Sequence, residues 1–519
     1  MAKTGSIEAS YICSTTLEHR KRYAQFFTPP ALADVMTDWL VKKEDLVSVL
    51  EPAFGLGIFT RFLQKKKKGL EIKGFDIDER IFSEAKRLYG SQVNLLFQDY
   101  MYNDWNNRYD GIICNPPYFK FHDYDNKGVI NEIETRLSCR LNGFTNLYTL
   151  FLLKSIHQLK TGGRCIYIVP SEFMNSDYGT LVKAHLLKTR TLRHIIVFDF
   201  EENLFDDAIT TSCLILCENT DDNPNVRFTC LRNGEDIGKL AGLMSGRNVD
   251  GIISREYRFS ELDPYIKWKT YYQENTSSRF RDLVPFSSFA RIMRGIATGA
   301  NDYFVFNLSK ARSYGLEEKH LLPCISRCTD VKTNVFTSED FEELKRADKK
   351  VFLLNAVGSD DKQISDYLAK GIEEGIDKKY LTSNRNPWYS LENRPPSPIW
   401  VSVFNRTGIR FVRNKAGISN LTTFHCVYPQ RNLYNDVSDD LLFAYLQTDI
   451  ARKIFTDNSR EYGKGLQKFE PNDLNQGMML DISKLPEAQK RRIETIYMEN
   501  EKDAPIREIE SILLDFFEI

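Results

Sequence analysis

Short apolar runs alternate with longer amphipathic stretches over the first half of the chain, a pattern of buried strands separated by helices. A helix is predicted to about residue 43, with Thr28 as N-cap and Pro29 at its first position. The alternation predicts an α/β fold with a doubly wound, mostly parallel sheet covered on both faces. Further helices are predicted at 145–159 and 178–189, and strands at 47–51, 70–75, 93–97, 109–114, 164–169, 192–198 and 212–217.

The alternation of strands and helices ends near Asn248, and residues 255–519 show irregular short strands and helices. We therefore expect an α/β domain over residues 1–255 and, within residues 256–519, a linker followed by an α+β domain. Residues 1–22 carry no clear pattern and are expected to form a partly ordered lead-in. The polar stretch 119–143 is expected to form a loop, which is a candidate lid over a site at the sheet edge.

Four consecutive predicted strands end in polar or acidic residues. The first runs into a glycine turn that begins at Glu51, the second ends at Asp76-Ile77-Asp78, and the third at Gln98-Asp99-Tyr100. The fourth ends in Asn115-Pro116-Pro117-Tyr118. Because the carboxyl ends of parallel strands share one edge of a sheet, these residues predict a ligand site.

The first two of these strand ends are typical of a nucleotide-like ligand. Gly55 and Gly57 lie between a predicted strand and a predicted helix, where backbone N–H groups approach a cofactor. The turn lacks the third glycine of a dinucleotide fingerprint, and no Gly-Lys-Ser/Thr of a phosphate loop follows. In such folds, an acidic residue about 20 positions after the glycine turn accepts hydrogen bonds from a ribose diol. Asp76 and Asp78 both qualify, and Asp76 is favoured because it comes first.

Asn115-Pro116-Pro117-Tyr118 forms a rigid tip, because two consecutive prolines end the ladder and fix the backbone. The amide of Asn115 and the carbonyl of Pro116 can accept hydrogen bonds from a planar amine, and the Tyr118 ring can stack on it. Taken alone, this tip does not distinguish a DNA adenine from an RNA base or a glutamine amide.

Composition and charge exclude few classes of protein. The 519 residues carry 70 basic and 71 acidic side chains, so the net charge of −1 neither favours nor excludes nucleic acid. No apolar stretch long enough to span a membrane and no signal core occur, so we expect a cytoplasmic protein with no membrane partner. The ten cysteines lack matching metal-ligand partners and are expected to be reduced thiols, with no bound metal.

Basic and aromatic residues interleave at three places in the second half, within residues 291–295, 406–415 and 460–468. Each cluster is compatible with an ordinary solvated surface, but three in one half favour a DNA-facing surface. The candidate DNA-binding residues are Arg294, Arg406, Arg410, Arg413, Lys415, Lys464 and Lys468.

Taken in order, these motifs resemble S-adenosylmethionine-dependent DNA methyltransferases that act on adenine N6, in the arrangement called gamma. In that arrangement the cofactor motifs come first, the catalytic tetrapeptide next and the target-recognition region last. The likeness spans roughly residues 23–217, with a weaker continuation at Arg294-Gly295, Thr298-Gly299 and Asn301. Its carriers are Gln25–Pro29, Glu51–Phe59, Asp76, Asp99-Tyr100, Asn115–Tyr118, Asn146–Phe151 and Phe205.

The resemblance implies roles for the matched positions. Asp76 would hold the ribose hydroxyls of the cofactor, and Asp99 would accept a hydrogen bond from its adenine amino group between walls formed by Tyr100 and Phe151. The methionine side of the cofactor pocket would be formed by Thr28, Glu51, Ala53, Gly55 and Gly57. The target base would meet Asn115, Pro116 and Pro117 and be stacked by Tyr118 and Phe205.

Several alternatives stay open at this point. The same tip would suit a methyltransferase of RNA adenine or of a protein glutamine, and a non-catalytic DNA-binding subunit is a further class. About 260 residues of unpatterned C-terminal sequence fit a double-stranded-DNA-reading region better. Residues before the first cofactor motif leave little room for a nuclease, so any cognate restriction endonuclease is expected to be a separate protein. The recognition sequence cannot be read from one chain.

Overall fold

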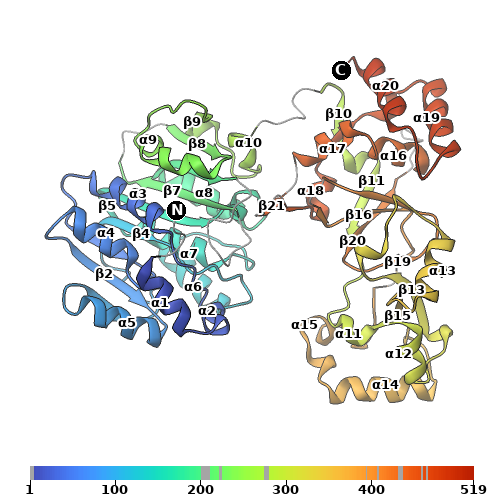
Figure 1. Cartoon of the computed structure of the whole chain (residues 1–519), viewed down its shortest axis with the longest axis horizontal. Coiled ribbons are helices and arrows are strands. Elements are labelled where there is room, and N and C mark those ends of the chain that lie inside the picture. Colours follow the sequence, from blue (N-terminus) through green and yellow to red (C-terminus); the bar gives the residue numbers. More distant parts are fainter. Residues whose placement is uncertain are drawn as a thin grey trace. The chain divides into compact units, whose positions relative to one another are not determined.

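The computed structural model describes residues 5–199, 211–220, 225–273, 280–392, 394–405, 408–430, 437–457, 460–462 and 466–518 (Figure 1). The chain divides into two compact units. The first comprises Met1–Glu274 with Glu461–Gly465, and the second comprises Asn275–Arg460 and Leu466–Ile519.

The first unit is built on a nine-stranded sheet of order β3-β2-β1-β4-β5-β7-β6-β8-β9. Neighbouring strands from β3 to β5 are parallel, β7 is antiparallel to both β5 and β6, and β9 is antiparallel to β8. The predicted doubly wound, mostly parallel sheet is confirmed. Its strands are β1 (Ser48–Glu51), β2 (Glu71–Asp76), β3 (Asn94–Phe97), β4 (Tyr109–Cys114), β5 (Leu159–Pro170), β6 (Leu192–Phe198), β7 (Ser212–Glu218), β8 (Asn225–Leu231) and β9 (Ser254–Arg258).

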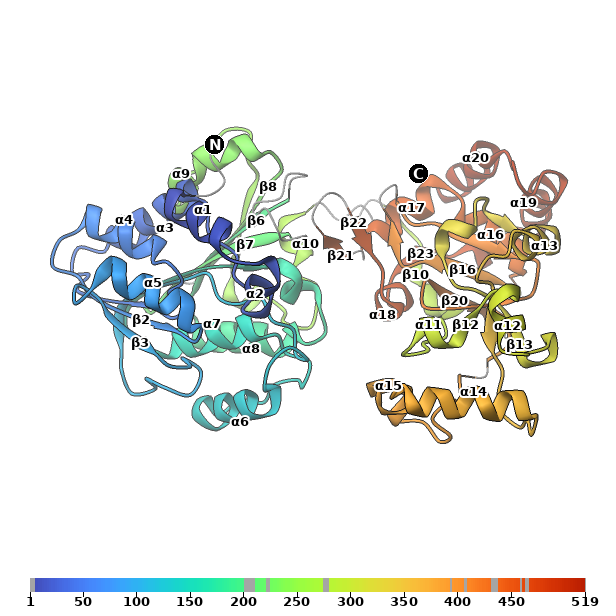
Figure 2. The same cartoon turned by 60° about the horizontal axis from the view of Figure 1, so that its bottom comes forward.

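Helices cover both faces of this sheet (Figures 1 and 2). Successive strand residues point to opposite faces, so Leu50 and Ile112 belong to one core while Val49 and Ile113 belong to the other. The face with Leu50 packs against α6 (Asn126–Leu137), α7 (Leu147–His157), α8 (Gly179–Thr189) and α10 (Lys269–Tyr272). The opposite face packs against α3 (Pro30–Val41), α4 (Ile58–Lys66), α5 (Glu79–Tyr89) and α9 (Leu240–Met244).

Two segments of the first unit are more ordered than the sequence indicated. The expected lead-in forms α1 (Ser6–Ser14) and α2 (Leu17–Arg22), and the ring of Tyr11 packs against Leu56 and Ile81. The expected polar loop 119–143 contains α6, whose Val129 and Ile133 are buried. In both segments the stabilising contacts are long-range, and only the apolar spacing within α6 was available as a local signal.

The division between the units falls after Glu274, about one short strand and helix later than the expected boundary at residue 255. The reason is that β9 extends the sheet by pairing with β8, and the buried ring of Trp268 packs against the rings of Phe228 and Tyr271 in the core of this unit.

The second unit is α+β, as expected, with short strands in the sheets β11-β20-β16-β18-β14, β12-β15-β13-β19 and β10-β23 and in the antiparallel pair β17-β22. Its strands are β10 (Leu283–Pro285), β11 (Ala290–Arg294), β12 (Val305–Phe306), β13 (Leu321–Ile325), β14 (Val335–Phe336), β15 (Phe352–Leu354), β16 (Ile399–Ser402), β17 (Phe404–Asn405), β18 (Phe411–Asn414), β19 (Ser419–Asn420), β20 (Phe424–Pro429), β22 (Leu466–Lys468) and β23 (Met478–Leu480). The short strand β21 (Arg460–Tyr462) begins at the last residue before the chain passes into Glu461–Gly465 of the first unit. The helices of the second unit are α11 (Asn301–Phe304), α12 (Leu308–Ser313), α13 (Ser338–Arg346), α14 (Lys362–Glu373), α15 (Tyr380–Ser383), α16 (Asp439–Leu446), α17 (Asp449–Thr456), α18 (Pro471–Asn475), α19 (Glu487–Glu499) and α20 (Ile506–Phe517).

None of the described helices combines the length and the apolar character that a membrane span requires. All ten cysteines lie in these ranges and are free thiols.

Candidate active site

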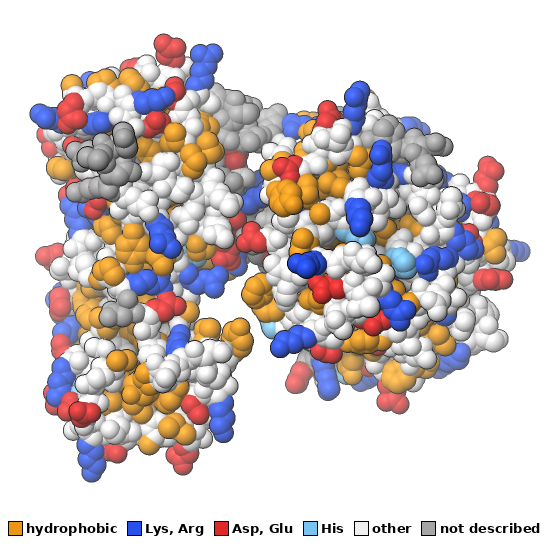
Figure 3. Space-filling model, turned by 180° about the vertical axis from the view of Figure 1, so that it is seen from behind, with side chains coloured by type: hydrophobic (Ala, Val, Ile, Leu, Met, Phe, Trp, Pro, Cys, Tyr) orange, Lys and Arg blue, Asp and Glu red, His pale blue; other side chains and the backbone are white. Residues whose placement is uncertain are grey.

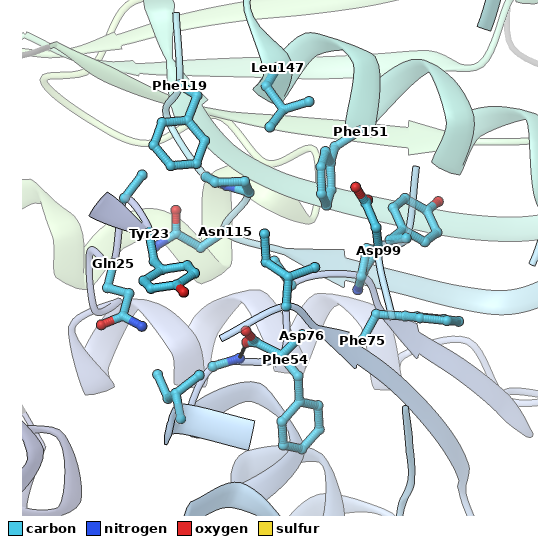
Figure 4. Close-up of a pocket in the computed structure, with 18 of the residues that line it drawn as sticks. Tyr23, Gln25, Phe54, Phe75, Asp76, Asp99, Asn115, Phe119, Leu147 and Phe151 are labelled. Carbon is cyan, nitrogen blue, oxygen red and sulfur yellow. Dashed lines mark hydrogen bonds between the residues drawn. The ribbon is translucent and has the colours of Figure 1, made fainter. Parts of the chain in front are cut away.

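The carboxyl ends of β1 to β4 surround a cavity of about 400 Å³ in the first unit (Figure 4). Each of these strand ends contributes one predicted polar residue to the cavity wall, namely Glu51, Asp76, Asp99 and Asn115. Figure 4 shows Asn115 on one side of the cavity and Asp99 with Phe151 on the other, with Asp76 between them. The four predicted strand ends therefore do meet at one site.

The glycine turn between β1 and α4 is shaped by conformation and by close packing. Gly57 has φ +65°, and a Cβ there would lie 2.7 Å from both Phe54 and Tyr89, so only glycine fits. The hydroxyl of Tyr89 donates to the Gly57 carbonyl at 2.7 Å and fixes the turn from behind. The N–H of Gly55, also at positive φ, donates to Asp76 Oδ2 at 2.9 Å and joins the ends of β1 and β2.

Three carboxyl groups in the cavity wall have raised pKa values, chiefly because burial penalises their charged forms. Burial raises the pKa of Glu51 to about 8, although the Thr60 hydroxyl donates to it at 2.7 Å. Burial also raises the pKa of Asp76 to about 6 and that of Asp99 above its usual value. A ligand that carries positive charge and hydrogen-bond donors would stabilise all three in their ionised form.

Asn115 is held with its amide in one orientation. Its Nδ2 donates to the carbonyl of Phe26 at 2.7 Å and to the hydroxyl of Thr28 at 3.1 Å. The other end of the amide, Oδ1, is buried and has no hydrogen-bond partner among the described residues. A buried acceptor without a partner costs free energy, and such atoms mark sites where a donor is expected to bind.

Thr28 therefore differs from its expected local role. Helix α3 begins at Pro30 with Pro29 as the N-cap residue, so the Thr28 hydroxyl is not the cap. It is buried and turned toward the amide of Asn115 instead. Ala53 and Pro117 also line the cavity, and Pro116 is buried beside it.

Tyr118 lies behind the cavity rather than in its wall. Its ring stacks on Phe26 with centroids 5.3 Å apart and an interplanar angle of 19°, and Tyr148 approaches it edge-on. Its hydroxyl donates to the Ile168 carbonyl at 3.3 Å. The other predicted stacking residue, Phe205, lies outside the described residues.

Tyr100 and Phe151 form one wall together and do not face each other across the cavity. Their ring centroids are 5.2 Å apart, which leaves no room for a base between them. Ile77 lines the cavity as well and keeps an unusually exposed side chain for an isoleucine, at 50%. Ile77 was not among the residues predicted for the site, although its position directly after the strand-end acid Asp76 was a usable signal.

The N-terminal segment contributes a further wall that the sequence analysis also missed. Tyr23 and Gln25 line the cavity on the side of Asn115 (Figure 4). Gln25 is anchored because its Nε2 donates to Asp78 Oδ2 at 2.6 Å. Asp78 caps α5, accepting from Arg80 N at 3.1 Å, and lies outside the cavity wall. The geometry therefore favours Asp76 over Asp78 as the ribose-facing acid.

Five of the candidate DNA-binding residues lie in described parts of the second unit, and their side chains are engaged with neighbours. Arg413 is largely buried and donates to Asp440 at 2.9 Å, and Arg410 donates to Asn334 at 3.2 Å. These two arginines support the fold of the unit. Arg294 and Lys468 pair with Glu470, and Lys415 pairs with Glu501.

DNA contact stays a prediction for the exposed Arg294 and for the partly exposed Lys415 and Lys468. Arg406 and Lys464 lie outside the described residues. On the face drawn in Figure 3, basic side chains are interspersed with acidic ones, so that face alone does not mark a nucleic-acid path.

Comparison with known proteins gives the class to which this fold and site belong. Residues 39–205 match the model of the Eco57I restriction-modification methylase family, and residues 272–514 match the C-terminal domain of Type II methyltransferase M.Eco57I. The class is therefore the DNA methyltransferases of restriction-modification systems.

Within this class, the chain belongs to the Type II methyltransferases. It is 56% identical over 520 residues to Type II methyltransferase M.AccI of Acinetobacter calcoaceticus, which covers 98% of this chain and 96% of that protein. It is also 22% identical over 484 residues to Type II methyltransferase M.XamI of Xanthomonas campestris pv. amaranthicola, covering 91% and 88% of the two chains. A solved structure of the Type IIL restriction-modification enzyme MmeI in complex with DNA shares the fold, with a TM-score of 0.55, 13% identity and coverage of 94% of this chain and 71% of that chain.

Proposed function

We propose that this protein transfers a methyl group from S-adenosylmethionine to N6 of an adenine flipped out of duplex DNA. In this proposal it is the modification component of a restriction-modification system. The observation that carries the proposal is the buried, unpartnered Oδ1 of Asn115, which lies at the cavity in an orientation fixed by Phe26 and Thr28. It is an acceptor prepared for an N–H donor, as an exocyclic amine requires.

The wall of the cavity fits S-adenosylmethionine, whose sulfonium supplies the methyl group. Burial raises the pKa of Glu51, and pairing with the cofactor's ammonium group would lower it again, so this carboxyl would be ionised in the complex. Asp76, with Gly55 N–H bound to Oδ2, is the candidate acceptor for the ribose hydroxyls. Asp99 would accept from the adenine amino group, and Ile77 and Phe151 are the candidate walls for that ring.

The chain's own contribution to transfer would be electrostatic and positional. The lone pair of an adenine amine is delocalised into the ring, so the amine is a poor nucleophile. Oδ1 of Asn115 and the carbonyl of Pro116 would accept from its two N–H bonds and stabilise the positive charge that develops on the nitrogen. Thr28 and the Phe26 carbonyl would keep Oδ1 aimed at the amine during this step.

A paired base cannot reach such a site, so the proposal includes base flipping. In the free protein the Tyr118 ring already stacks on Phe26, so in this proposal the flipped base would take the place of the Phe26 ring there. Stacking against Tyr118 and, from the sequence likeness, Phe205 would then offset part of the unpairing cost at about 1–3 kcal/mol per base. The likeness in fold to MmeI, which was solved in complex with DNA, supports double-stranded DNA as the substrate. The second unit is the proposed target-recognition region, and a cognate endonuclease is proposed as a separate chain.

The substrate class is tested by label transfer. With cofactor carrying a labelled methyl group, label is expected in duplex DNA that contains the recognition sequence and absent from transfer RNA and from a release-factor protein. Label found only in RNA or in protein would refute DNA as the substrate. A chain that binds DNA and cofactor without transferring label would instead be a non-catalytic subunit.

Cofactor affinity is expected to rise with pH up to about pH 8. Glu51 is protonated below about pH 8 in the free protein, and only its ionised form can pair with an ammonium group, so binding must release its proton. Affinity should therefore increase up to about tenfold per pH unit between pH 6 and 7.5, level off near pH 8, and fall above it as the cofactor's ammonium group loses its own proton. Calorimetry in two buffers of different ionisation enthalpy measures how many protons are released when the cofactor binds. Glu51→Gln should bind more weakly and release no proton from this site.

A further inference from the structure

Lys154 is a fully buried lysine on α7 that has no part in the proposed transfer. It lies one turn beyond Phe151, on the same face of the helix. Phe151 lines the cavity, and Lys154 reaches the loop between β3 and β4 behind it. One helix face therefore contacts the cavity and the loop that carries Asp99 and Tyr100.

The ammonium group of Lys154 binds this loop directly. Its Nζ donates to the carbonyls of Tyr100 and Asn103. The same atom lies 4.0 Å from the ring centroid of Tyr100 and 4.3 Å from that of Trp105, which is cation–π geometry. Within the loop, Met101 N–H donates to Asp99 Oδ1 at 2.8 Å and Asn103 Nδ2 donates to the Asp99 carbonyl at 2.8 Å. The position of Asp99 is thus tied to backbone groups that Lys154 holds.

Such an arrangement is costly for stability alone. Burial lowers the pKa of Lys154 to about 7, against the opposing attraction of Asp104 and Asp99. An apolar side chain would fill the same core position without this cost. What an apolar side chain lacks is a pair of donors that fix two carbonyls of one loop.

We propose that Lys154 is a positioning residue that sets where Asp99 stands at the cavity, and thereby how strongly the site prefers an adenosyl cofactor over its deaminated inosyl counterpart. The inference rests on the proposed function, in which Asp99 accepts from the adenine amino group. An inosyl ring presents a carbonyl oxygen at that position, and two facing acceptors repel each other. The preference therefore depends on the exact placement of the Asp99 carboxylate.

The chain offers a matched control in Lys183. It is also buried, donates to the carbonyls of Met174 at 3.2 Å and Ile266 at 2.6 Å, and lies 5.8 Å from the ring of Trp268. Burial lowers its pKa to about 8, so it carries the same kind of cost. It does not line the cavity, and the loop it holds carries no proposed cofactor ligand.

The experiment compares calorimetric affinities of the full-length protein for S-adenosylhomocysteine and S-inosylhomocysteine. The wild-type protein is expected to prefer the adenosyl ligand by about 100-fold or more, because the inosyl ligand would leave the Asp99 acceptor without the donor that the site is built to bind. Lys154→Met should reduce this preference to below about tenfold, while Lys183→Met should keep it. Lys154→Gln, whose amide keeps two N–H donors but is uncharged and sits on a shorter side chain, should also lose most of the preference.

The possible outcomes distinguish the role proposed for Lys154 from the role proposed for Asp99. A wild-type protein without any preference would contradict the proposed place of Asp99 itself. A wild-type preference that persists in folded Lys154→Met or Lys154→Gln would overturn only the role of Lys154. Failure of both Lys154 variants to fold, alongside a folded Lys183→Met, would also overturn it by making Lys154 a core-stability group.

Discussion

Asn115→Ala is expected to lower the rate of methyl transfer by about 10²–10³-fold or more while leaving cofactor affinity within about threefold of wild type. The reason is that the substitution removes a preorganised acceptor that acts on the amine as its charge develops. The side chain makes its two hydrogen bonds with Phe26 and Thr28, so its loss need not disturb the carboxylates of the cavity. Single-turnover transfer and calorimetric cofactor binding measure the two effects separately.

Thr28→Val is the matched control for this prediction. It removes one of the two acceptors that orient the Asn115 amide but leaves the amide in place, so a loss of about tenfold is expected. Full transfer activity in Asn115→Ala would show that Oδ1 is not the acceptor. A collapse of cofactor binding in that variant would show that the residue serves the cofactor site instead.

Asp76→Ala is expected to weaken cofactor binding by about 10–100-fold. A charged acceptor contributes about 1.5–3 kcal/mol per hydrogen bond, and the substitution also frees the Gly55 N–H that shapes the glycine turn. The effect should appear in the dissociation constant of the cofactor, measured by calorimetry in the absence of DNA.

Asp78→Ala distinguishes the two acids of this strand end. Asp78 caps α5 and accepts from Tyr11, His19 and Gln25, so its loss should lower the melting temperature more than the cofactor affinity. If Asp78→Ala abolished cofactor binding while Asp76→Ala retained it, the assignment of the ribose-facing acid would be reversed.

The sequence predicted the sheet because its strands are continuous apolar runs with polar ends, and that signal is local. Glu51, Asp76, Asp99 and Asn115 could be grouped for the same reason, since the topology of a parallel sheet brings strand ends to one edge. What this reasoning could not supply was the direction of each side chain beyond the strand end.

The features that the sequence did not predict share a physical cause, which is contact between residues far apart in the chain. Helix α1 depends on Tyr11 packing against Ile81 and on an ion pair between Glu8 and Arg61, which no local pattern reveals. Arg413 was read as a surface cation, but it pairs with Asp440 27 residues away.

The cavity wall shows the same limit. Tyr100 and Phe151 are aromatic at the expected positions, yet their rings contact each other and share one side. The position of Ile77 followed directly from that of Asp76, but its exposure depends on how the loops around it close. The hydrogen bonds from Lys154 to the loop after β3 join residues more than 50 positions apart.

The central claim is that the acceptor at Asn115 serves the exocyclic amine of adenine in DNA. The most direct test is nucleoside analysis of genomic DNA from a host that expresses the chain, by mass spectrometry, with the Asn115→Ala variant alongside. The account predicts N6-methyldeoxyadenosine at one recurring sequence in the wild-type sample and its absence with the variant. N4-methyldeoxycytidine in its place, or an equal N6-methyldeoxyadenosine signal from Asn115→Ala, would contradict the account.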